Sequence, residues 1–188
     1  MKKFFLFLSF IIVIPLLAQD FKNEIENQFS DFSSLMTEKK FDKALSDYAN
    51  SDFLQIVPKE QLVAVMNQMF NSSEIEIELQ KPTDIVIHNQ VLEEKENKFI
   101  RIDYQQKIKM KFKDKEMSSE SLLMTLRNEF GRNNVIFEEK TGYFLIDTQK
   151  VVIANSQNEK NWKFTILERK QIPILKEFIP EQFLKNFK

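Results

Sequence analysis

The apolar residues of this chain change their spacing once, and this change limits the fold more than any other feature. Between residues 21 and 70 they recur every three or four positions, which is the period of amphipathic helices. From residue 74 they alternate with polar residues, which is typical of strands. Helices first and strands afterwards predict an α+β fold.

Three helices are expected in the first part of the chain. The longest one begins at Phe21 and carries one apolar face, made by Phe21, Ile25, Phe29, Phe32, Leu35 and Met36. A shorter helix is expected over residues 41–48. A third begins near Pro58, which fits the first turn of a helix, and ends at Asn71. These helices are expected to pack on the sheet.

The second part predicts a curved, mainly antiparallel sheet of about six strands. We expect strands at residues 74–79, 84–92, 99–112, 134–139, 142–154 and 161–168. A helix that Ser118 or Ser119 caps and Gly131 ends is inserted between the third and fourth strands. In the apolar tail, Pro180 separates two short helical pieces, which we expect to cover a sheet edge or a groove.

The first 18 residues have the pattern of a signal peptide. Lys2 and Lys3 precede about 15 largely apolar residues that end at the small residue Ala18. We expect cleavage near Ala18, export to the periplasm or the medium, and a single domain over residues 19–188. The alternative is a retained anchor, but a membrane-spanning helix needs roughly 20 apolar residues. No Cys follows, so no disulfide is expected.

The composition excludes several classes of function. With 27 basic and 28 acidic residues the net charge is −1, which gives no general attraction to nucleic acid. One His, no Cys and two Gly rule out a cysteine nucleophile, a phosphate-binding glycine loop and a site with several histidines. We therefore expect no cofactor and no metal. The 19 Phe residues favour an aromatic core.

Acid/base chemistry would need a carboxylate and a phenol or acid donor in an apolar cavity. Asp103, Asp147 and Tyr104 are the nearest candidates. Adjacent strand residues point to opposite faces, so Asp103 and Tyr104 do not share a cavity unless a bulge intervenes. Asp147 shares a face with Tyr143. His88 has no obvious partner and is expected to be structural or exposed. No catalytic residue is therefore predicted.

Gln106 interrupts an otherwise apolar strand face, and a buried amide needs hydrogen-bond partners. Either Gln106 bonds to backbone inside the core, or it forms with Tyr104 the polar end of a ligand pocket. In the second case Phe99, Trp162 and the Met-rich third helix supply the walls. The candidate pocket residues are Tyr104, Gln106, Trp162 and Asp147.

Two rows of like charges stand on different predicted strands. Glu74, Glu76 and Glu78 form the acidic row, and the basic row consists of Lys107, Lys109, Lys111 and Lys113. We expect the rows to face each other across paired strands, where each opposite pair contributes roughly 0.2 to 1 kcal/mol. The alternative is a basic stripe for an anionic partner.

The order of these elements resembles the nuclear-transport-factor-2-like superfamily. The resemblance runs from about Phe21 to Leu167, covers the helices, the hairpins and the inserted helix, and includes the late strand with Trp162-Lys163-Phe164. The leader ending Leu17-Ala18-Gln19 is similar to those of exported Bacteroidetes proteins. The superfamily has a cone-shaped α+β fold and includes ketosteroid isomerase. Its members differ widely in activity, so the resemblance implies a fold rather than a function.

These observations favour an exported, non-catalytic binding or interaction domain. Its ligand is either a small apolar molecule held in the cone or a protein partner, and we also consider a homodimer through the open sheet face. The alternative is a cofactor-free acid/base enzyme of the ketosteroid-isomerase type. A pocket with two ionisable groups within hydrogen-bond reach favours the enzyme, whereas an apolar cavity or patch without such a pair favours binding.

Overall fold

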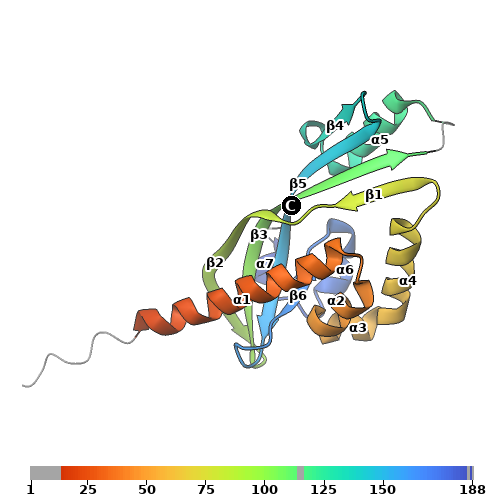
Figure 1. Ribbon diagram of the computed structural model, residues 1–188. Coiled ribbons are helices and arrows are strands. Elements are labelled where there is room, and N and C mark those ends of the chain that lie inside the picture. Colours follow the sequence, from red (N-terminus) through yellow and green to blue (C-terminus); the bar gives the residue numbers. More distant parts are fainter. Residues whose placement is uncertain (1–13, 114–116, 186, 188) are drawn as a thin grey trace, which may run out of the picture.

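The structure is a computed structural model that describes residues 14–113, 117–185 and 187, with side chains from residue 21 on. Residues 1–13, which hold most of the predicted leader, lie outside this range. The expected α+β class is confirmed. Helices form the N-terminal part, six strands form an antiparallel open sheet, one helix is inserted between the third and fourth strands, and short helices end the chain (Figure 1).

Among the described residues, four helices precede the sheet: α1 (Ile14–Thr37), α2 (Phe41–Tyr48), α3 (Ser51–Ile56) and α4 (Lys59–Phe70). α2 and α4 match the predicted helices. α1 contains the helix predicted from Phe21 but begins at Ile14, inside the predicted leader, so the helix runs through Ala18. α3 is additional. It forms because the side-chain oxygen of Asn50 accepts hydrogen bonds from the backbone N–H groups of Asp52 and Phe53. A helix of six residues is too short to display an apolar period, so residue spacing did not reveal it.

The sheet is built around two long strands. Its members are β1 (Ile75–Leu79), β2 (Thr83–Glu94), β3 (Asn97–Phe112), β4 (Val135–Glu138), β5 (Tyr143–Ser156) and β6 (Lys163–Ile166). β3 pairs with β5 along most of its length, and all pairings between named strands are antiparallel. β2 and β6 flank this central pair at one end, whereas β1 and β4 flank it at the other.

One face of the sheet is covered by α1 and α2. The cluster between the layers is rich in aromatic rings, as the Phe content predicted: Phe29 lies 5.2 Å from Tyr104 and 5.4 Å from Phe164, measured between ring centroids. Its buried members are Ile25, Phe29, Phe32, Ala44, Ile100, Ile102, Tyr104, Val152, Ala154, Trp162 and Phe164. Burial of these side chains is the main force that holds the helices on the sheet.

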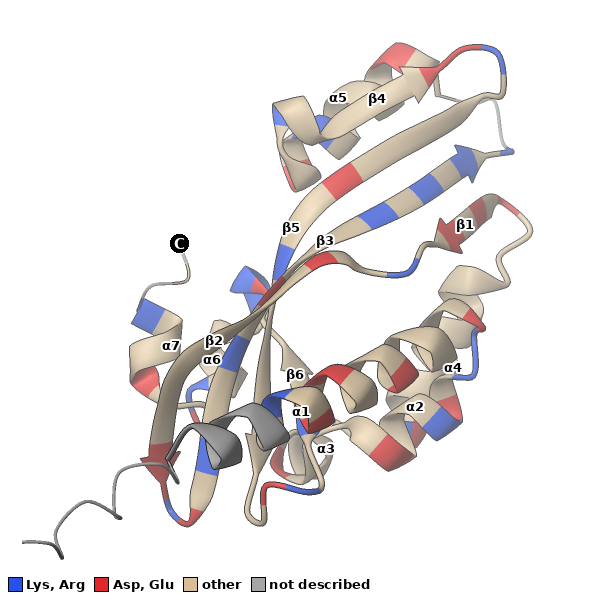
Figure 2. Cartoon of the chain, turned by 60° about the vertical axis from the view of Figure 1, so that its left-hand side comes forward, with Lys and Arg blue, Asp and Glu red and all other residues tan. Residues whose placement is uncertain are grey.

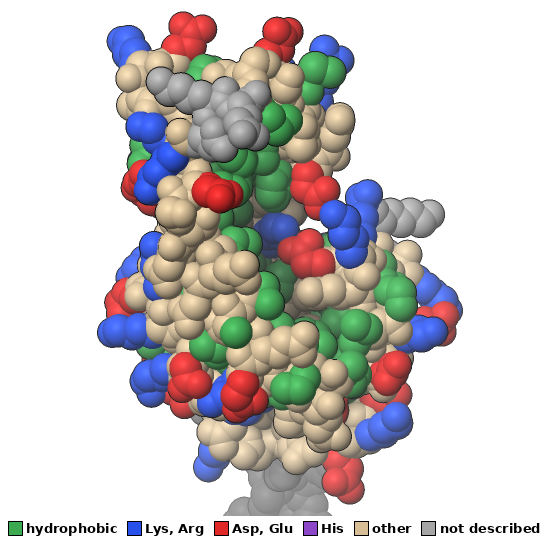
Figure 3. Space-filling view, turned by 90° about the vertical axis from the view of Figure 1, so that its right-hand side faces the viewer, with side chains coloured by type: hydrophobic (Ala, Val, Ile, Leu, Met, Phe, Trp, Pro, Cys, Tyr) green, Lys and Arg blue, Asp and Glu red, His purple; other side chains and the backbone are tan. Residues whose placement is uncertain are grey.

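The inserted helix α5 (Ser119–Phe130) covers the other end of the sheet. Ser118 caps it, since its hydroxyl accepts from the backbone N–H of Ser121, and Gly131 ends it with a φ of +100°. A short turn, η1 (Arg132–Asn134), then leads into β4. α5 closes a second cluster of Leu126, Val135, Phe144 and Ile146. Figure 3 shows the surface hollowed between this end and the helical part below it.

The C-terminal tail covers the opposite face of the sheet. It consists of η2 (Arg169–Gln171), α6 (Ile172–Leu175) and α7 (Glu181–Lys185), and Pro180 separates the two α-helices as predicted. A third cluster joins this tail to the sheet: Phe99, Val151, Ile153, Leu167, Leu175, Ile179, Phe183 and Leu184. The tail therefore covers a sheet face rather than an edge.

The two charge rows face each other, as predicted. In the register of β1 and β3, Glu76 is opposite Lys111 and Glu78 is opposite Lys109, and Figure 2 shows the acidic and basic rows on these neighbouring strands. Lys109 Nζ lies 3.7 Å from a carboxylate oxygen of Glu78. The basic row is therefore partly neutralised within the sheet, which supports the structural interpretation over the anionic-partner one.

Candidate functional site

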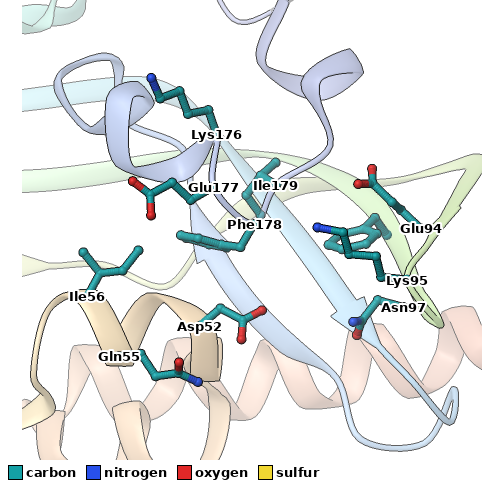
Figure 4. Close-up of a pocket in the computed structure, with 11 residues that line it drawn as sticks. Asp52, Gln55, Ile56, Glu94, Lys95, Asn97, Lys176, Glu177, Phe178 and Ile179 are labelled. Carbon is teal, nitrogen blue, oxygen red and sulfur yellow. The ribbon is translucent and has the colours of Figure 1, made fainter.

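A pocket of ligand size lies between α3, the β2–β3 turn and the C-terminal tail (Figure 4). We call it the tail groove. It has a volume of about 360 Å³ and is lined by Asp52, Gln55, Ile56, Glu94, Lys95, Asn97, Phe99, Lys176, Glu177, Phe178 and Ile179. This volume falls within the range of roughly 300 to 1,000 Å³ that is usual for ligand sites. Its walls come from three segments that are far apart in the sequence.

A chain of asparagine side chains holds two of these walls together. The Nδ2 of Asn50, which is almost fully buried, donates to Oδ1 of Asn155 at 2.9 Å. Asn155 in turn donates to Oδ1 of Asn97 at 3.4 Å, at the start of β3. The same Asn50 caps α3. This network therefore fixes α3 against the strands and positions the helical wall of the groove.

Aromatic contacts hold the third wall. The ring of Phe178 lies 6.2 Å from that of Phe53 on α3, measured between centroids. Phe178 extends across the groove between the tail and α3 (Figure 4). Together with the exposed Ile56 it gives the groove an apolar floor, whereas Phe99 and Ile179, which also line the groove, are almost fully buried. Such a floor can accept an apolar group from a ligand.

The turn that forms the strand side of the groove has an unusual backbone. Glu94 pairs with Asn97, so Lys95 and Glu96 make a two-residue turn, with φ values of 50° and 64°. Both central residues of such a turn need positive φ, and Asn-Gly is the preferred sequence. Two non-glycine residues cost roughly 1–2 kcal/mol each there. The turn directs the Lys95 side chain toward Phe178, as Figure 4 shows.

The rim of the groove carries charges of both signs. Asp52, Glu94 and Glu177 are acidic, and Lys95 and Lys176 are basic. Within the described residues none of these five side chains takes part in a salt bridge shorter than 4 Å. The charged rows on β1 and β3 differ from this rim, because Lys109 and Glu78 of those rows form an ion pair with each other. The charges of the rim are thus available to a bound molecule.

The predicted pocket around Tyr104 and Gln106 is almost filled. Gln106 Nε2 donates to the backbone oxygens of Gln80 at 2.7 Å and Lys107 at 3.0 Å. Of the two predicted alternatives, Gln106 thus follows the one in which its amide bonds to backbone. The cavity beside Tyr104 and Gln106 measures about 40 Å³. A cavity of this size holds about one water molecule. Burial raises the pKa of Tyr104 far above its usual value, so its hydroxyl stays protonated.

The other two pocket candidates lie elsewhere. Trp162 is buried in the cluster under α1, and its indole N–H donates to the backbone oxygen of Glu159 at 3.1 Å. Asp147 lies on the opposite face of the sheet, half exposed, where Gln105 Nε2 donates to it at 2.6 Å. The structure therefore brings together Tyr104 and Gln106, places Trp162 in the same layer, and separates Asp147 from all three.

His88 has the partner that residue spacing did not reveal. Its Nε2 lies 3.0 Å from Oδ2 of Asp103, and Arg101 binds the same carboxylate through Nε at 2.7 Å and Nη2 at 3.3 Å. Asp103 and Tyr104 point to opposite faces, as strand geometry predicted. The sequence predicted that β2 and β3 are neighbouring strands. The register that brings His88 to Asp103 depends on bulges in β2, and the spacing of apolar residues does not reveal bulges.

Comparison with protein-family models finds no match for this chain, and comparison with curated proteins finds no significant relative. Within the described residues, no group of three or more His, Cys, Asp or Glu side chains is placed to hold a metal ion. No helix in the same part of the chain is long and apolar enough to cross a membrane. The site must therefore be interpreted from its own geometry.

Proposed function

We propose that residues 19–188 form an exported binding domain without a catalytic role, whose tail groove holds the apolar part of a small ligand or protein partner. The observation that carries this proposal is the groove itself. It combines a ligand-sized volume of about 360 Å³ with an apolar floor made by Phe178 and Ile56. Seven of the eleven lining residues are polar or charged and four are apolar, so the groove suits a ligand that carries polar groups as well as an apolar part.

The charged rim supports binding of a molecule that carries charges of its own. Carboxylates and ammonium groups that lack an internal ion pair gain from a partner, since charge complementarity across an interface orients the partner and excludes wrong ones. In Figure 4, Glu177 lies above Phe178, Asp52 lies below it and Lys95 lies to its right, so charges of both signs surround this ring. A ligand with an apolar centre and polar ends fits this arrangement.

Export is proposed on the sequence pattern of the first 18 residues. Lys2 and Lys3 precede a largely apolar stretch that ends at the small residue Ala18, which is typical of a signal peptide.

We also propose membership of the nuclear-transport-factor-2-like superfamily, on the order of helices, hairpins and inserted helix. The acid/base alternative has weaker support in this fold. Asp103 and Tyr104 lie on opposite faces of β3, and the cavity at Tyr104 measures about 40 Å³. An enzyme of the ketosteroid-isomerase type needs its base and its donor in one apolar cavity.

Native mass spectrometry of the protein purified from its own host tests the proposal. We expect a retained ligand or partner on the wild-type chain. The variant Ile56→Lys places a charge on the apolar floor and should lose the retained species. Val65→Lys is the matched control, because Val65 is an exposed apolar helix residue that does not line the groove.

Two results would contradict the proposal. One is a wild-type spectrum that contains only the bare monomer at every condition of gentle ionisation. The other is equal retention by wild type and Ile56→Lys, which would place the bound molecule outside the groove. If the retained partner is a second copy of this chain and the Ile56→Lys variant still forms the dimer, the dimer interface lies outside the groove, which also contradicts the proposal.

A further inference from the structure

A second pocket lies on the tail-covered face of the sheet and shares no lining residue with the tail groove. It has a volume of about 160 Å³ and lies between the edge strand β2, the central strand β3 and the helix α7. Its lining residues are His88, Gln90, Arg101, Gln182 and Phe183. This is room for a small molecule only.

A bulge in β2 creates the polar wall of this pocket. The register passes from Ile87 opposite Ile102 to Val91 opposite Ile100, so residues 88–90 of β2 lie opposite the single residue Arg101. Bulges re-aim side chains and are enriched beside functional sites. Here the bulge brings His88 and Gln90 to the same pocket as Arg101.

Asp103 holds this wall from outside the pocket. It does not line the cavity, but its carboxylate accepts from Arg101 Nε at 2.7 Å, from Arg101 Nη2 at 3.3 Å, and contacts His88 Nε2 at 3.0 Å. A guanidinium group has five N–H donors, and these contacts use two of them. Asp103 therefore orients the guanidinium and the imidazole while leaving other donors of Arg101 for a ligand.

The residues that line the pocket are rich in donors and include no carboxylate, since Asp103 contacts Arg101 and His88 from outside the pocket. Arg101 contributes a guanidinium group, which stays charged, and Gln90 adds an amide. Planar guanidinium groups match the oxygen pairs of carboxylates and phosphates. We propose that this pocket binds a small oxyanion of the carboxylate or phosphate kind between Arg101 and His88.

The chain offers an unusually clean probe of this site, because His88 is its only histidine. The imidazole proton resonances of His88 are followed by NMR at fixed pH and fixed ionic strength, with sodium chloride replaced stepwise by sodium acetate or by sodium phosphate. We expect saturable shifts with at least one of these anions. Acetate alone would indicate a carboxylate ligand, phosphate alone a phosphate ligand, and both the shared oxyanion chemistry.

Two variants and a matched control make the test specific. Gln90→Glu adds a carboxylate to the exposed edge of the wall and should weaken binding at least tenfold, while Arg101→Lys, which loses the fork geometry, should weaken it at least threefold. Gln149→Glu makes the same change at an exposed position on β5 and should bind like wild type. Thermal unfolding of each variant shows whether it is folded.

The proposal is overturned if neither anion gives a saturable shift of the His88 resonances. It is also overturned if Gln90→Glu and Gln149→Glu bind with equal affinity, because the shift would then come from a general surface effect. If Arg101→Lys unfolds, the comparison between the two glutamate variants decides the question by itself.

Discussion

The side-chain amide of Asn50 donates to that of Asn155 at 2.9 Å, and this bond joins the helical wall of the tail groove to the sheet. Asn50 has a double role, because its oxygen also caps α3. Replacing a capping Asn by Ala costs about 1 kcal/mol. Loss of a buried side-chain hydrogen bond adds about 1 kcal/mol.

We predict that Asn50→Ala lowers the free energy of unfolding by about 2 kcal/mol, since both contributions disappear. Asn50→Ser keeps a capping oxygen and should lose only about half as much. Urea unfolding of the two variants measures the difference. Equal losses in the two variants would show that the cap contributes nothing to stability.

Lys109 and Glu78 face each other across β3 and β1, with a side-chain separation of 3.7 Å. We predict that Lys109→Glu destabilises the protein by about 1 kcal/mol, because like charges then stand opposite each other. Adding Glu78→Lys should restore most of the loss. Adding Glu76→Lys instead should restore less, since Glu76 is opposite Lys111. Identical rescue by the two second substitutions would contradict the register.

Thr148 carries a buried hydroxyl without a hydrogen-bond partner in the described part of the chain. It lies opposite Gln106 in the register of β3 and β5. Thr148→Val keeps the shape and removes the unsatisfied group, so we predict a gain of about 1 kcal/mol in the free energy of unfolding. A loss of stability in Thr148→Val, measured by urea unfolding, would show that the hydroxyl has a partner.

Tyr143 donates its hydroxyl hydrogen bond to Glu76 at 2.6 Å, and this bond is the main cause that raises the pKa of Tyr143 to about 12. The usual value is 10.0. A pKa that folding raises favours the protonated phenol. Its contribution to stability is therefore complete below pH 10 and disappears as the pH rises from 10 through about 12.

Absorbance at 295 nm follows the ionisation of this phenol. The pKa of Tyr48 and the pKa of Tyr104 are also raised, in both cases mainly by burial. We therefore predict that no tyrosine of the folded protein ionises near pH 10. In Glu76→Gln one phenol should ionise earlier than in wild type. A Tyr143→Phe variant identifies it. A full tyrosine transition near pH 10 in the folded wild-type protein would contradict the hydrogen bond to Glu76.

The architecture was predictable because long elements repeat their apolar period many times. From Phe21 on, α1 buries Ile25, Phe29 and Phe32 on one face, and β3 buries Ile100, Ile102 and Tyr104, so the apolar spacing predicted both elements. The spacing did not predict that α1 begins at Ile14. The facing of Glu78 and Lys109 followed from charge, because opposite rows on neighbouring strands attract. By contrast, α3 is short and depends on a single capping residue, Asn50. The spacing of apolar residues gives no information about such a cap.

The sites were harder to predict, because they are formed by segments that meet only in the folded chain. The tail groove needs Phe178 to lie beside Phe53, and nothing in the local sequence of either residue specifies the other. The contact of His88 with Asp103 depends on the register on one side of a bulge. Gln106 was identified because it breaks an apolar face, but its backbone partner, Gln80, lies beyond the end of β1.

The central claim is that the tail groove is where this protein binds, and site-specific photo-crosslinking in its own host tests it most directly. A photoreactive amino acid is placed at Ile56, which lines the groove, or at Val65, which is exposed on α4 and does not. We predict a covalent adduct of defined mass from position 56 and none from position 65. Adducts from both positions in equal yield, or from position 65 alone, would contradict the claim.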